Sequence, residues 1–250
     1  MAKVPYIGVD GVARKCKSIY IGVDGVARKV KSGYIGVNGV AKQFYSSVKP
    51  VPLSTFAEGD TVYINENGSP VEFYVAKHNY ESGLNGSGRT LLVRKNCDVS
   101  MKWNDTNKST YENSTIDTWL NNTYKNTLDA GIVDSIGATS FYYTPGDGNN
   151  TVTTIQRSIF LLSTTELGDE TTIANTEGTA LQTISILLIA TKNGTPVSYW
   201  TRSPSAKISG LACLVTEEGL TNRQNNVTYS YYVRPAFTLP EDTLVTGPSV

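Results

Sequence analysis

Histidine and closely spaced cysteines are almost missing from this chain of 250 residues. His78 is the single histidine, and the three cysteines, Cys16, Cys97 and Cys213, lie far apart without a Cys-x-x-Cys pair. A structural zinc site needs four Cys or His ligands, usually in closely spaced pairs. We therefore expect no metal ion, and three free thiols rather than one disulfide.

Recognisable catalytic patterns are missing as well. Nucleophilic chemistry needs a base beside the nucleophile, most often histidine, and His78 stands in YVAKHNYESG, a context typical of a surface or hydrogen-bonded loop residue. Carboxylates such as Glu112, Asp117 and Asp169 show no pairing of the kind that glycosidases use. The glycine-rich run at 82–88 lacks the lysine of a phosphate-binding loop. The sequence thus predicts no catalytic residue, no enzyme activity and no cofactor.

The chain also has no long hydrophobic run and no excess of charge of either sign. Its longest purely apolar stretch, residues 186–190, is far shorter than the ~20 residues that span a bilayer. The first five residues lack the apolar core of a signal peptide, so we expect synthesis in the cytoplasm without a signal peptide and no membrane insertion. Because 22 basic side chains balance 22 acidic ones, a nucleic-acid partner is not expected.

An internal repeat with a period of 14 fills residues 6–47, in the copies YIGVDGVARKCKSI, YIGVDGVARKVKSG and YIGVNGVAKQFYSS. Asp-Gly and Asn-Gly tolerate the positive φ of a type I′ turn. Each copy therefore predicts a β-hairpin, with turns at Asp10-Gly11, Asp24-Gly25 and Asn38-Gly39. A lone hairpin is barely stable in water, so the three copies need one another or a partner. Their basic tails leave nucleic-acid binding open, but solvated strand edges are the preferred interpretation.

Prolines at 50 and 52 mark an extended linker at 46–56. The sequence thus predicts two domains, a repeat module at 1–49 and a ligand-binding domain at 50–250. In the second domain, residues 112–129 predict a helix that Ser114 caps, with Asp117 three residues further on. The apolar face of this helix has helical spacing and should pack into the core; it consists of Ile116, Trp119, Leu120, Tyr124 and Leu128.

Two rigid blocks of sequence, residues 199–204 (YWTRSP) and 232–237 (YVRPAF), flank a looser polar stretch. A scaffold that positions loops of free composition is typical of binding proteins. The chain is rich in Ser, Thr, Asn, Gly and Tyr, and only 18% of its residues are charged. Such a composition is typical of β-rich adhesins and of antibody-like binding surfaces.

This region resembles the C-terminal end of C-type-lectin-like variable proteins, which are the targets of diversity-generating retroelements. Their pattern W-x-R-S-P, A-x-x-V-x-x-x-G and V-R-P-A stands here as Trp200, Arg202-Ser203-Pro204, Ala212, Val215, Gly219 and Val233-Arg234-Pro235-Ala236. The resemblance extends upstream to about Gly59. It implies an α+β fold, a C-type-lectin-like domain with an N-terminal β-hairpin repeat module, in which the predicted helix packs against the sheet.

The same resemblance implies roles for single residues. Arg202 and Arg234 would hydrogen-bond backbone carbonyls as parts of the framework, and Trp200 would lie in the core. The side chains between the framework positions would face outward and bind a ligand, although an ordinary polar loop is the alternative. They are Ser205, Lys207, Ser209, Leu211, Cys213, Leu214, Thr216, Leu220, Asn222, Arg223, Asn225, Asn226, Thr228 and Tyr229.

The repeat is similar to N-terminal segments of phage tail proteins from Gram-positive hosts, which implies attachment to other tail or virion proteins through residues 1–49, or oligomerisation, with a homotrimer as one arrangement. The function expected from both resemblances is non-catalytic receptor binding by a phage or prophage tail protein. Its C-terminal surface would bind a bacterial surface protein or glycan, and several copies per virion would supply avidity. The alternatives are a glycan-acting tail enzyme and a structural tail decoration protein without a ligand.

Overall fold

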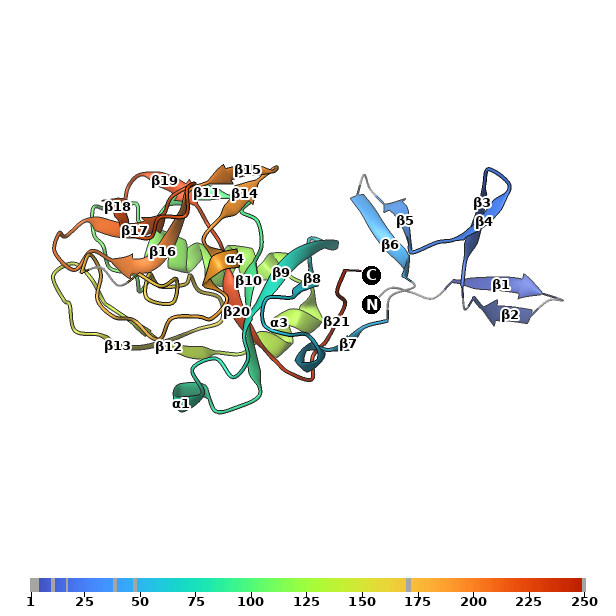
Figure 1. The fold of residues 1–250 in the computed structure, drawn as a ribbon, viewed down its shortest axis with the longest axis horizontal. Helices are drawn as coiled ribbons and strands as arrows, with labels where there is room; N and C mark the ends of the chain where they lie inside the picture. Colours follow the sequence, from blue (N-terminus) through green and yellow to red (C-terminus); the bar gives the residue numbers. More distant parts are fainter. Residues whose placement is uncertain are drawn as a thin grey trace.

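A computed structural model describes residues 5–9, 12–16, 18–37, 40–46, 49–169 and 172–248. It consists of a large body, residues 49–248, and a repeat module, the described residues between 5 and 46. The module is a string of hairpins that extends from one end of the body (Figure 1), and the hairpin of β5 and β6 lies nearest to the body. Its strands are β1 (Tyr6–Val9), β2 (Val12–Lys15), β3 (Tyr20–Val23), β4 (Val26–Lys29), β5 (Ser32–Val37) and β6 (Val40–Ser46).

The three predicted hairpins are present as three separate antiparallel pairs, β1 with β2, β3 with β4 and β5 with β6. In the second hairpin, Asp24 has φ 51° and Gly25 has φ 77°, which is the backbone that a type I′ turn requires. The Asp-Gly turn therefore fixes the register in which Val23 faces Val26. The other two turn dipeptides, at 10–11 and 38–39, lie outside the described residues.

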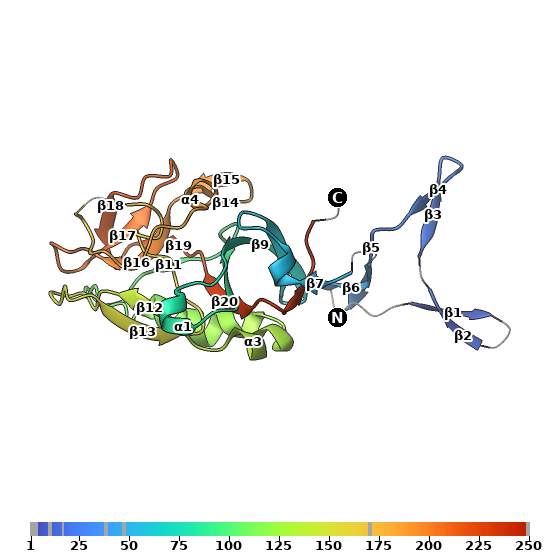
Figure 2. The same cartoon turned by 60° about the horizontal axis from the view of Figure 1, so that its bottom comes forward.

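Two sheets form the frame of the body (Figures 1 and 2). The first is antiparallel throughout and has the order β20 (Ala236–Pro240), β10 (Arg89–Arg94), β9 (Ser69–Lys77), β8 (Thr61–Glu66). The second has the order β11 (Ser100–Lys102), β19 (Ser230–Tyr232), β16 (Tyr199–Pro204), β17 (Leu211–Val215), β18 (Arg223–Asn226). In the second sheet only the contact of β16 with β19 is parallel.

Smaller elements cover and connect these sheets. Three further antiparallel pairs are β12 (Thr139–Tyr143) with β13 (Thr153–Arg157), β14 (Ala190–Lys192) with β15 (Thr195–Val197), and β7 (Val51–Pro52) with β21 (Leu244–Val245). The last of these pairs joins the two ends of the body. The helical segments are short: η1 (Leu53–Thr55), α1 (Ser82–Asn85), α2 (Thr115–Thr118), η2 (Trp119–Tyr124), η3 (Lys125–Thr127), α3 (Ala130–Ile136) and α4 (Ile184–Leu187). None of the helices in the described residues is long and apolar enough to cross a membrane.

The expectation of an α+β, C-type-lectin-like fold is wrong in its class, because 40% of the structure is strand and only 14% is helix. The helix predicted at 112–129 is one turn of α-helix, a π-helical turn and a 3₁₀ turn in succession. Asn121 supplies a physical reason, since its side-chain amide donates to the Asp117 carbonyl and also to the Ile159 carbonyl of another segment. Such side chains compete with the regular backbone ladder of a helix. The chain is therefore β-rich.

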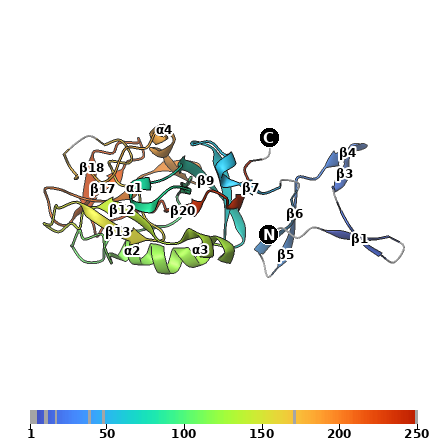
Figure 3. The same cartoon turned by 90° about the horizontal axis from the view of Figure 1, so that it is seen from below.

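Other features of that segment are as predicted. Ser114 is the N-cap, and its Oγ accepts a hydrogen bond of 3.2 Å from the Asp117 backbone amide. Ile116, Leu120 and Tyr124 are buried. Figure 3 shows these turns and α3 together along one side of the body. The spacing of apolar residues thus identified the buried face correctly although the helix itself is irregular.

The core of the body is built around β10, in which every residue from Thr90 to Arg94 is buried. Leu91, Leu92 and Val93 are at most 1% exposed, and Phe73 of β9 packs on Phe237 of β20 with ring centroids 5.3 Å apart. Full burial of one such side chain contributes about 1.5–3 kcal/mol. Strand β10 therefore lies in the interior of the first sheet, between β20 and β9.

Candidate functional site

The candidate site stands on strand β16, in which all six side chains are buried. Arg202 is fully buried, and its guanidinium donates to the carbonyls of Tyr142 and Leu161, each at 2.9 Å, and to Glu166 Oε2 at 2.7 Å. Trp200 is 1% exposed, and its Nε1 donates to the Met101 carbonyl at 3.1 Å. The framework roles expected for both residues are confirmed.

Two buried carboxylates face Arg202, and sequence analysis missed both. Glu166 also accepts hydrogen bonds from the Ser163 amide at 2.8 Å and from the Tyr80 hydroxyl. Glu177 accepts from the Thr144 amide and from Ser203 Oγ, each at 2.6 Å, and lies 3.9 Å from Arg202 Nε. Burial raises the pKa of Glu177 above its ordinary value, although Arg202 acts in the opposite direction. The sequence offered one indirect indication of these carboxylates: an arginine predicted to be buried needs an acidic partner.

Arg234 supports the neighbouring segment in the same way. Its Nε donates to the Arg94 carbonyl at 2.8 Å, its Nη2 donates to the Lys95 carbonyl at 3.0 Å, and its Nη1 donates to the Leu187 carbonyl. The guanidinium also lies 5.1 Å from the ring centroid of Tyr199. The prediction that this arginine bonds to backbone carbonyls is confirmed, so both arginines fix loops rather than face a ligand.

The fourteen predicted binding residues do not share one environment. Six are exposed: Lys207, Ser209, Leu220, Asn222, Arg223 and Tyr229. Five are half-buried: Leu211, Thr216, Asn225, Asn226 and Thr228. Three are buried: Ser205, Cys213 and Leu214.

The expectation that Ser205, Cys213 and Leu214 face outward is therefore wrong. Cys213 and Leu214 belong to β17, which pairs with β16 on one side and with β18 on the other. The resemblance implied a displayed segment here, but four of the five residues of β17 are buried, as expected for an inner strand that is packed on both faces. Ser205 turns inward because its Oγ accepts hydrogen bonds from the amides of Lys207 and Ile208, at 3.3 and 3.1 Å.

The exposed residues gather at opposite ends of the β17–β18 ladder. Leu211 pairs with Asn226 at one end, and Leu214 pairs with Arg223 at the other. Three residue steps of about 3.4 Å separate these ends by roughly 10 Å. The recognition segment predicted as one surface is thus two surfaces. At the first end lies a group that we call the loop rim: Lys207, Ile208, Ser209, Thr228 and Tyr229.

Hydrogen bonds connect the loop rim to loops from distant parts of the chain. Ser209 Oγ donates to Asp147 Oδ1, and Lys207 Nζ lies 3.0 Å from Thr172 Oγ1. Asn226, at the base of the rim, donates from Nδ2 to Asn107 Oδ1 at 2.9 Å. The rim, which is built from two loops, is therefore tied to three further loops rather than being an isolated turn.

Two glycines and one serine hold these loops in close contact. Ser109 is buried, and its Oγ accepts hydrogen bonds from the amides of Gly210 and Asp147, at 3.3 and 3.2 Å. Gly146 has φ +85°, and a Cβ there would collide with the Ser109 carbonyl oxygen. At Gly210, with φ +78°, a Cβ would lie 2.6 Å from Asn107 Oδ1. Glycine tolerates both the positive φ and these close contacts, which are with the Ser109 backbone at Gly146 and with the Asn107 side chain at Gly210.

The second end of the ladder is a smaller surface. Leu220, Asn222 and Arg223 are exposed there, and Arg223 donates only to its neighbour Asn222, at 2.8 Å to Oδ1. Gly219 lies against Ile189, whose Cδ1 is 3.1 Å from the position that a Cβ would take. Fewer segments meet here than at the loop rim, and no side-chain bond among the described residues ties Leu220 or Asn222 to a distant loop.

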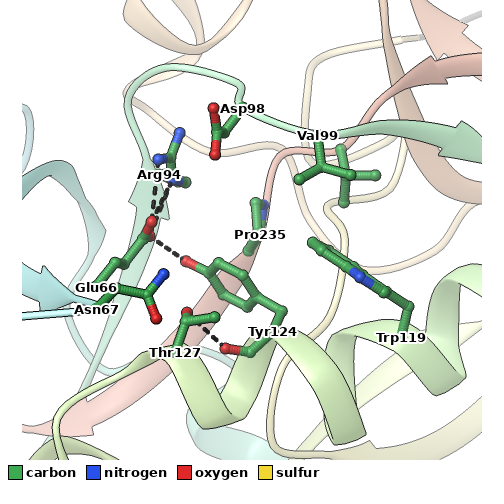
Figure 4. A pocket seen from close by; sticks show the side chains of 10 residues that line it. Glu66, Asn67, Arg94, Asp98, Val99, Trp119, Tyr124, Thr127 and Pro235 are labelled. Atoms are coloured by element: carbon green, nitrogen blue, oxygen red, sulfur yellow. Dashed lines mark hydrogen bonds and ion pairs between the residues drawn. The ribbon is translucent and has the colours of Figure 1, made fainter.

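A separate cavity of about 140 Å³ lies beside β8, β10 and η2 (Figure 4). Trp119 and Val99 form one wall, and Glu66 lies at the other. The Glu66 carboxylate accepts from Tyr124 at 2.5 Å and from Arg94 Nε and Nη2 at 2.9 and 3.0 Å. Ligand pockets usually measure about 300–1,000 Å³, and these bonds occupy the carboxylate. The cavity is therefore a weaker candidate than the loop rim.

Residues considered for chemistry are engaged in structural contacts. His78 contacts Thr90 Oγ1 through Nδ1 at 2.8 Å and the Phe56 carbonyl through Nε2 at 2.9 Å, which confirms it as a hydrogen-bonded loop residue. The three cysteines are free, as expected, and burial raises the pKa of the Cys97 thiol to about 11. The described part of the chain contains no group of three or more His, Cys, Asp or Glu side chains that could hold a metal ion.

Comparison with known proteins gives one family match. A model described as a domain of unknown function, DUF6273, matches residues 87–241, which is more than half of the chain and includes both framework strands and the loop rim. No curated protein and no solved structure matches the chain.

Proposed function

We propose, for this chain that belongs to the DUF6273 family, a non-catalytic binding function in which the loop rim contacts the ligand. In this proposal the body recognises a bacterial surface protein or glycan on behalf of a phage or prophage tail. The observation that carries it is the combination of an exposed rim with a rigid, buried support.

The support comes from Ser109, which bonds the loops beneath the rim, and from Arg202 on strand β16, and neither is available to a ligand. Arg202 is 0% exposed and Ser109 is fully buried. Each ties several backbone groups from distant segments, as described above. A binding surface built on such a base loses little conformational entropy when a ligand binds, and this loss is one of the main terms that oppose association.

The rim itself has the composition of an interaction surface. Tyr229 is 58% exposed and Ile208 is 51% exposed, while Lys207, Ser209 and Thr228 supply polar groups around them. Tyrosine is among the residue types that dominate binding energy at interfaces. Two large exposed side chains on fixed loops, with a polar margin, fit a protein or glycan surface better than they fit a buried small molecule.

The assignment to a tail is supported by resemblance. The three-copy repeat is similar to segments of phage tail proteins, and the framework pattern at 199–204 and 232–237 is similar to that of diversified binding proteins. A binding protein carried in several copies gains avidity from a modest single-site affinity, which suits a surface as small as the loop rim.

The experiment is a titration of fluorescently labelled full chain on intact cells from a panel of Gram-positive and Gram-negative bacteria. We expect saturable binding to at least one strain. Ile208→Ala with Tyr229→Ala should weaken it by about 30-fold or more, since loss of a central tyrosine anchor costs about 2 kcal/mol. Leu220→Ala with Asn222→Ala, at the other end of the same ladder, is the matched control and should change binding less than 3-fold.

Three results would contradict the proposal: no binding to any strain, equal loss in both double variants, or release of soluble cell-wall fragments by the purified chain. The last result would support a glycan-acting enzyme instead. Thermal unfolding of each variant, measured alongside, separates lost contact from lost fold.

A further inference from the structure

The hairpins of the repeat module have two different faces, and the second hairpin shows both completely. Antiparallel pairing places Tyr20 opposite Lys29, Ile21 opposite Arg28, Gly22 opposite Ala27 and Val23 opposite Val26. Residues directly opposite one another lie on the same face, and the face alternates along each strand. One face therefore carries Ile21, Val23, Val26 and Arg28, and the other carries Tyr20, Gly22, Ala27 and Lys29.

We call the first face the ridge and the second the trough. On the trough, a Cβ placed at Gly22 would meet no atom within 4 Å, and the same holds for Gly36 in the third hairpin. Both glycines are exposed, and neither has a positive φ. Glycine is therefore not needed for the backbone at these positions. The missing side chain at Gly22 leaves open space beside Tyr20, and an aliphatic side chain of another molecule can pack there.

Both faces are open to solvent in the single chain. Ile21 and Val26 on the ridge are 54% and 57% exposed, and Tyr20 beside the trough is 59% exposed. The equivalent side chains are also exposed in the other copies: Tyr6, Ile7, Val12, Tyr34 and Ile35. Two-stranded hairpins of this length are not stable in water without further packing, and Figures 1 to 3 show the three hairpins spread apart rather than stacked.

The exposed apolar area of the module is large enough for a protein–protein interface. Among the module side chains that the structure describes, eight large apolar ones are exposed. At roughly 100 Å² each they offer on the order of 800 Å² per chain, which is about the contribution of one partner to a standard protein–protein interface. Isolated exposed apolar residues are common on protein surfaces, but repeated ones on unsupported strands mark an interaction site.

We infer that the occupant of these faces is the repeat module of further copies of this chain, with the ridge of one hairpin packed into the trough of another. Three near-identical hairpins present the same two faces at a fixed period. A second module with the same period can contact all three hairpins at once. An unrelated partner would need three equivalent sites at the same spacing. This inference concerns residues 6–46 and is independent of the loop rim.

The unequal faces also restrict the symmetry of the assembly. Contact of a ridge with a trough joins two different surfaces. Repeated from copy to copy, such a heterologous contact forms a ring of three or more copies where the rotation closes and an open filament where it does not. The smallest closed assembly is therefore a trimer, which places three bodies at one end of the module.

The net charge of the module predicts how salt should change the stability of the assembly. Residues 1–49 contain nine Lys or Arg and two Asp, a net charge of +7, so the remaining 13 basic and 20 acidic residues give residues 50–250 a net charge of −7. In the described residues Arg28 and Lys29 are exposed and form no ion pair. Copies of a +7 module repel one another, so added salt should strengthen the assembly. An anionic partner would show the opposite salt dependence.

The test is light scattering during size exclusion of the full chain, at about 0.1 and 0.5 M NaCl. We expect a mass of three or more times 27.1 kDa, with less dissociation at the higher salt. Gly22→Val with Gly36→Val fills the trough without backbone strain and should give a monomer. Gly83→Val with Gly131→Val is the matched control, because these body glycines have equally open surroundings and no positive φ; it should remain assembled.

Ile7→Ser with Ile21→Ser and Ile35→Ser removes the ridge and should also give a monomer. The inference is overturned if wild type is monomeric at all concentrations, if the trough variant stays assembled, or if mass increases only after addition of polyphosphate, which would indicate an anionic partner. Tyr229→Ala with Ile208→Ala should assemble normally, so failure of the proposed function and failure of this inference give different results.

Discussion

In the body, Trp200, Arg202 and Phe237 are at most 1% exposed, whereas in the repeat module Tyr20 and Ile21 keep more than half of their surface in solvent. The two parts also carry opposite net charge, −7 for residues 50–250 and +7 for residues 1–49. Total charge is zero, which conceals this separation. The body therefore obtains its cohesion within one chain, while the module has its adhesive surfaces turned outward. In the assembly that we infer, apolar residues of the same type stabilise a fold in the body and contacts between copies in the module.

Arg202→Ala should destabilise the body more than any other substitution considered below. It leaves Glu166 and Glu177 buried without their cation, and removing one partner of a buried ion pair costs about 3–5 kcal/mol. All three tryptophans, Trp103, Trp119 and Trp200, lie in the body, so urea unfolding followed by tryptophan fluorescence measures the body alone. A loss below about 1 kcal/mol would show that the buried network does not hold the frame.

The next prediction compares two glycine substitutions in a loop beneath the loop rim. One adds a steric clash to backbone strain, and the other adds backbone strain alone. Gly146→Ala must accept φ +85° and a collision with Ser109, whereas Gly148→Ala has φ +92° in open space. We expect Gly148→Ala to cost about 1 kcal/mol, the usual penalty for a side chain at such a φ, and Gly146→Ala to cost clearly more. Urea unfolding of both variants measures the difference, and equal losses would mean that the close approach at Ser109 contributes nothing.

A smaller effect concerns pH. One guanidinium, that of Arg202, faces two buried carboxylates, and burial raises the pKa of Glu177 above its ordinary value of 4.5. A carboxyl with a raised folded-state pKa holds its proton more tightly when folded, so its contribution to stability is present at low pH and is lost as pH rises through the folded pKa. Glu177→Gln removes this loss while an amide can still bond to Thr144 and Ser203.

The stability of Glu177→Gln relative to wild type should therefore increase as pH rises from 4.5 toward neutrality, by less than the losses expected above. Urea unfolding at a series of pH values measures it. A relative stability that falls with rising pH would show that the charged form of Glu177 is the stabilising one.

The smallest effect tests whether the two parts are independent. Ile21→Ser on the module ridge should change the unfolding free energy of the body by no more than about 0.5 kcal/mol, the range for a surface substitution. Tryptophan fluorescence provides the readout. A larger loss would mean that the ridge packs on the body, and the contrast between the two parts would fail.

Local chemistry made some of these features predictable from sequence. Asp24-Gly25 predicted its own turn, and the spacing of Ile116, Leu120 and Tyr124 identified a buried face. Asn121 made that segment irregular through a bond to Ile159, 38 residues away, and such distant partners leave no local signal. The class of fold was implied by the resemblance and was wrong, although individual elements were predicted correctly.

The candidate site was predictable in part for the same reason. Arg202 and Arg234 were identified as framework, but Glu166 and Glu177 were not, because only the folded chain brings them to Arg202. Cys213 and Leu214 were assigned to a displayed surface since the sequence does not reveal that β17 is an inner strand, paired with β16 on one side and β18 on the other. Ile208, which is exposed on the rim, was missed because it lies between the polar residues Lys207 and Ser209.

Hydrogen exchange of the full chain, measured over a range of protein concentrations, shows whether the body folds within one chain while the module is ordered only by other copies. Amides of the body frame, in β16 and β20, should exchange slowly at every concentration, because their own chain buries them. Amides of β3 and β4 should be protected only at concentrations where copies assemble. Equal protection of the hairpins in the dilute monomer, or no protection in the concentrated sample, would contradict the claim that other copies hold the repeat module together.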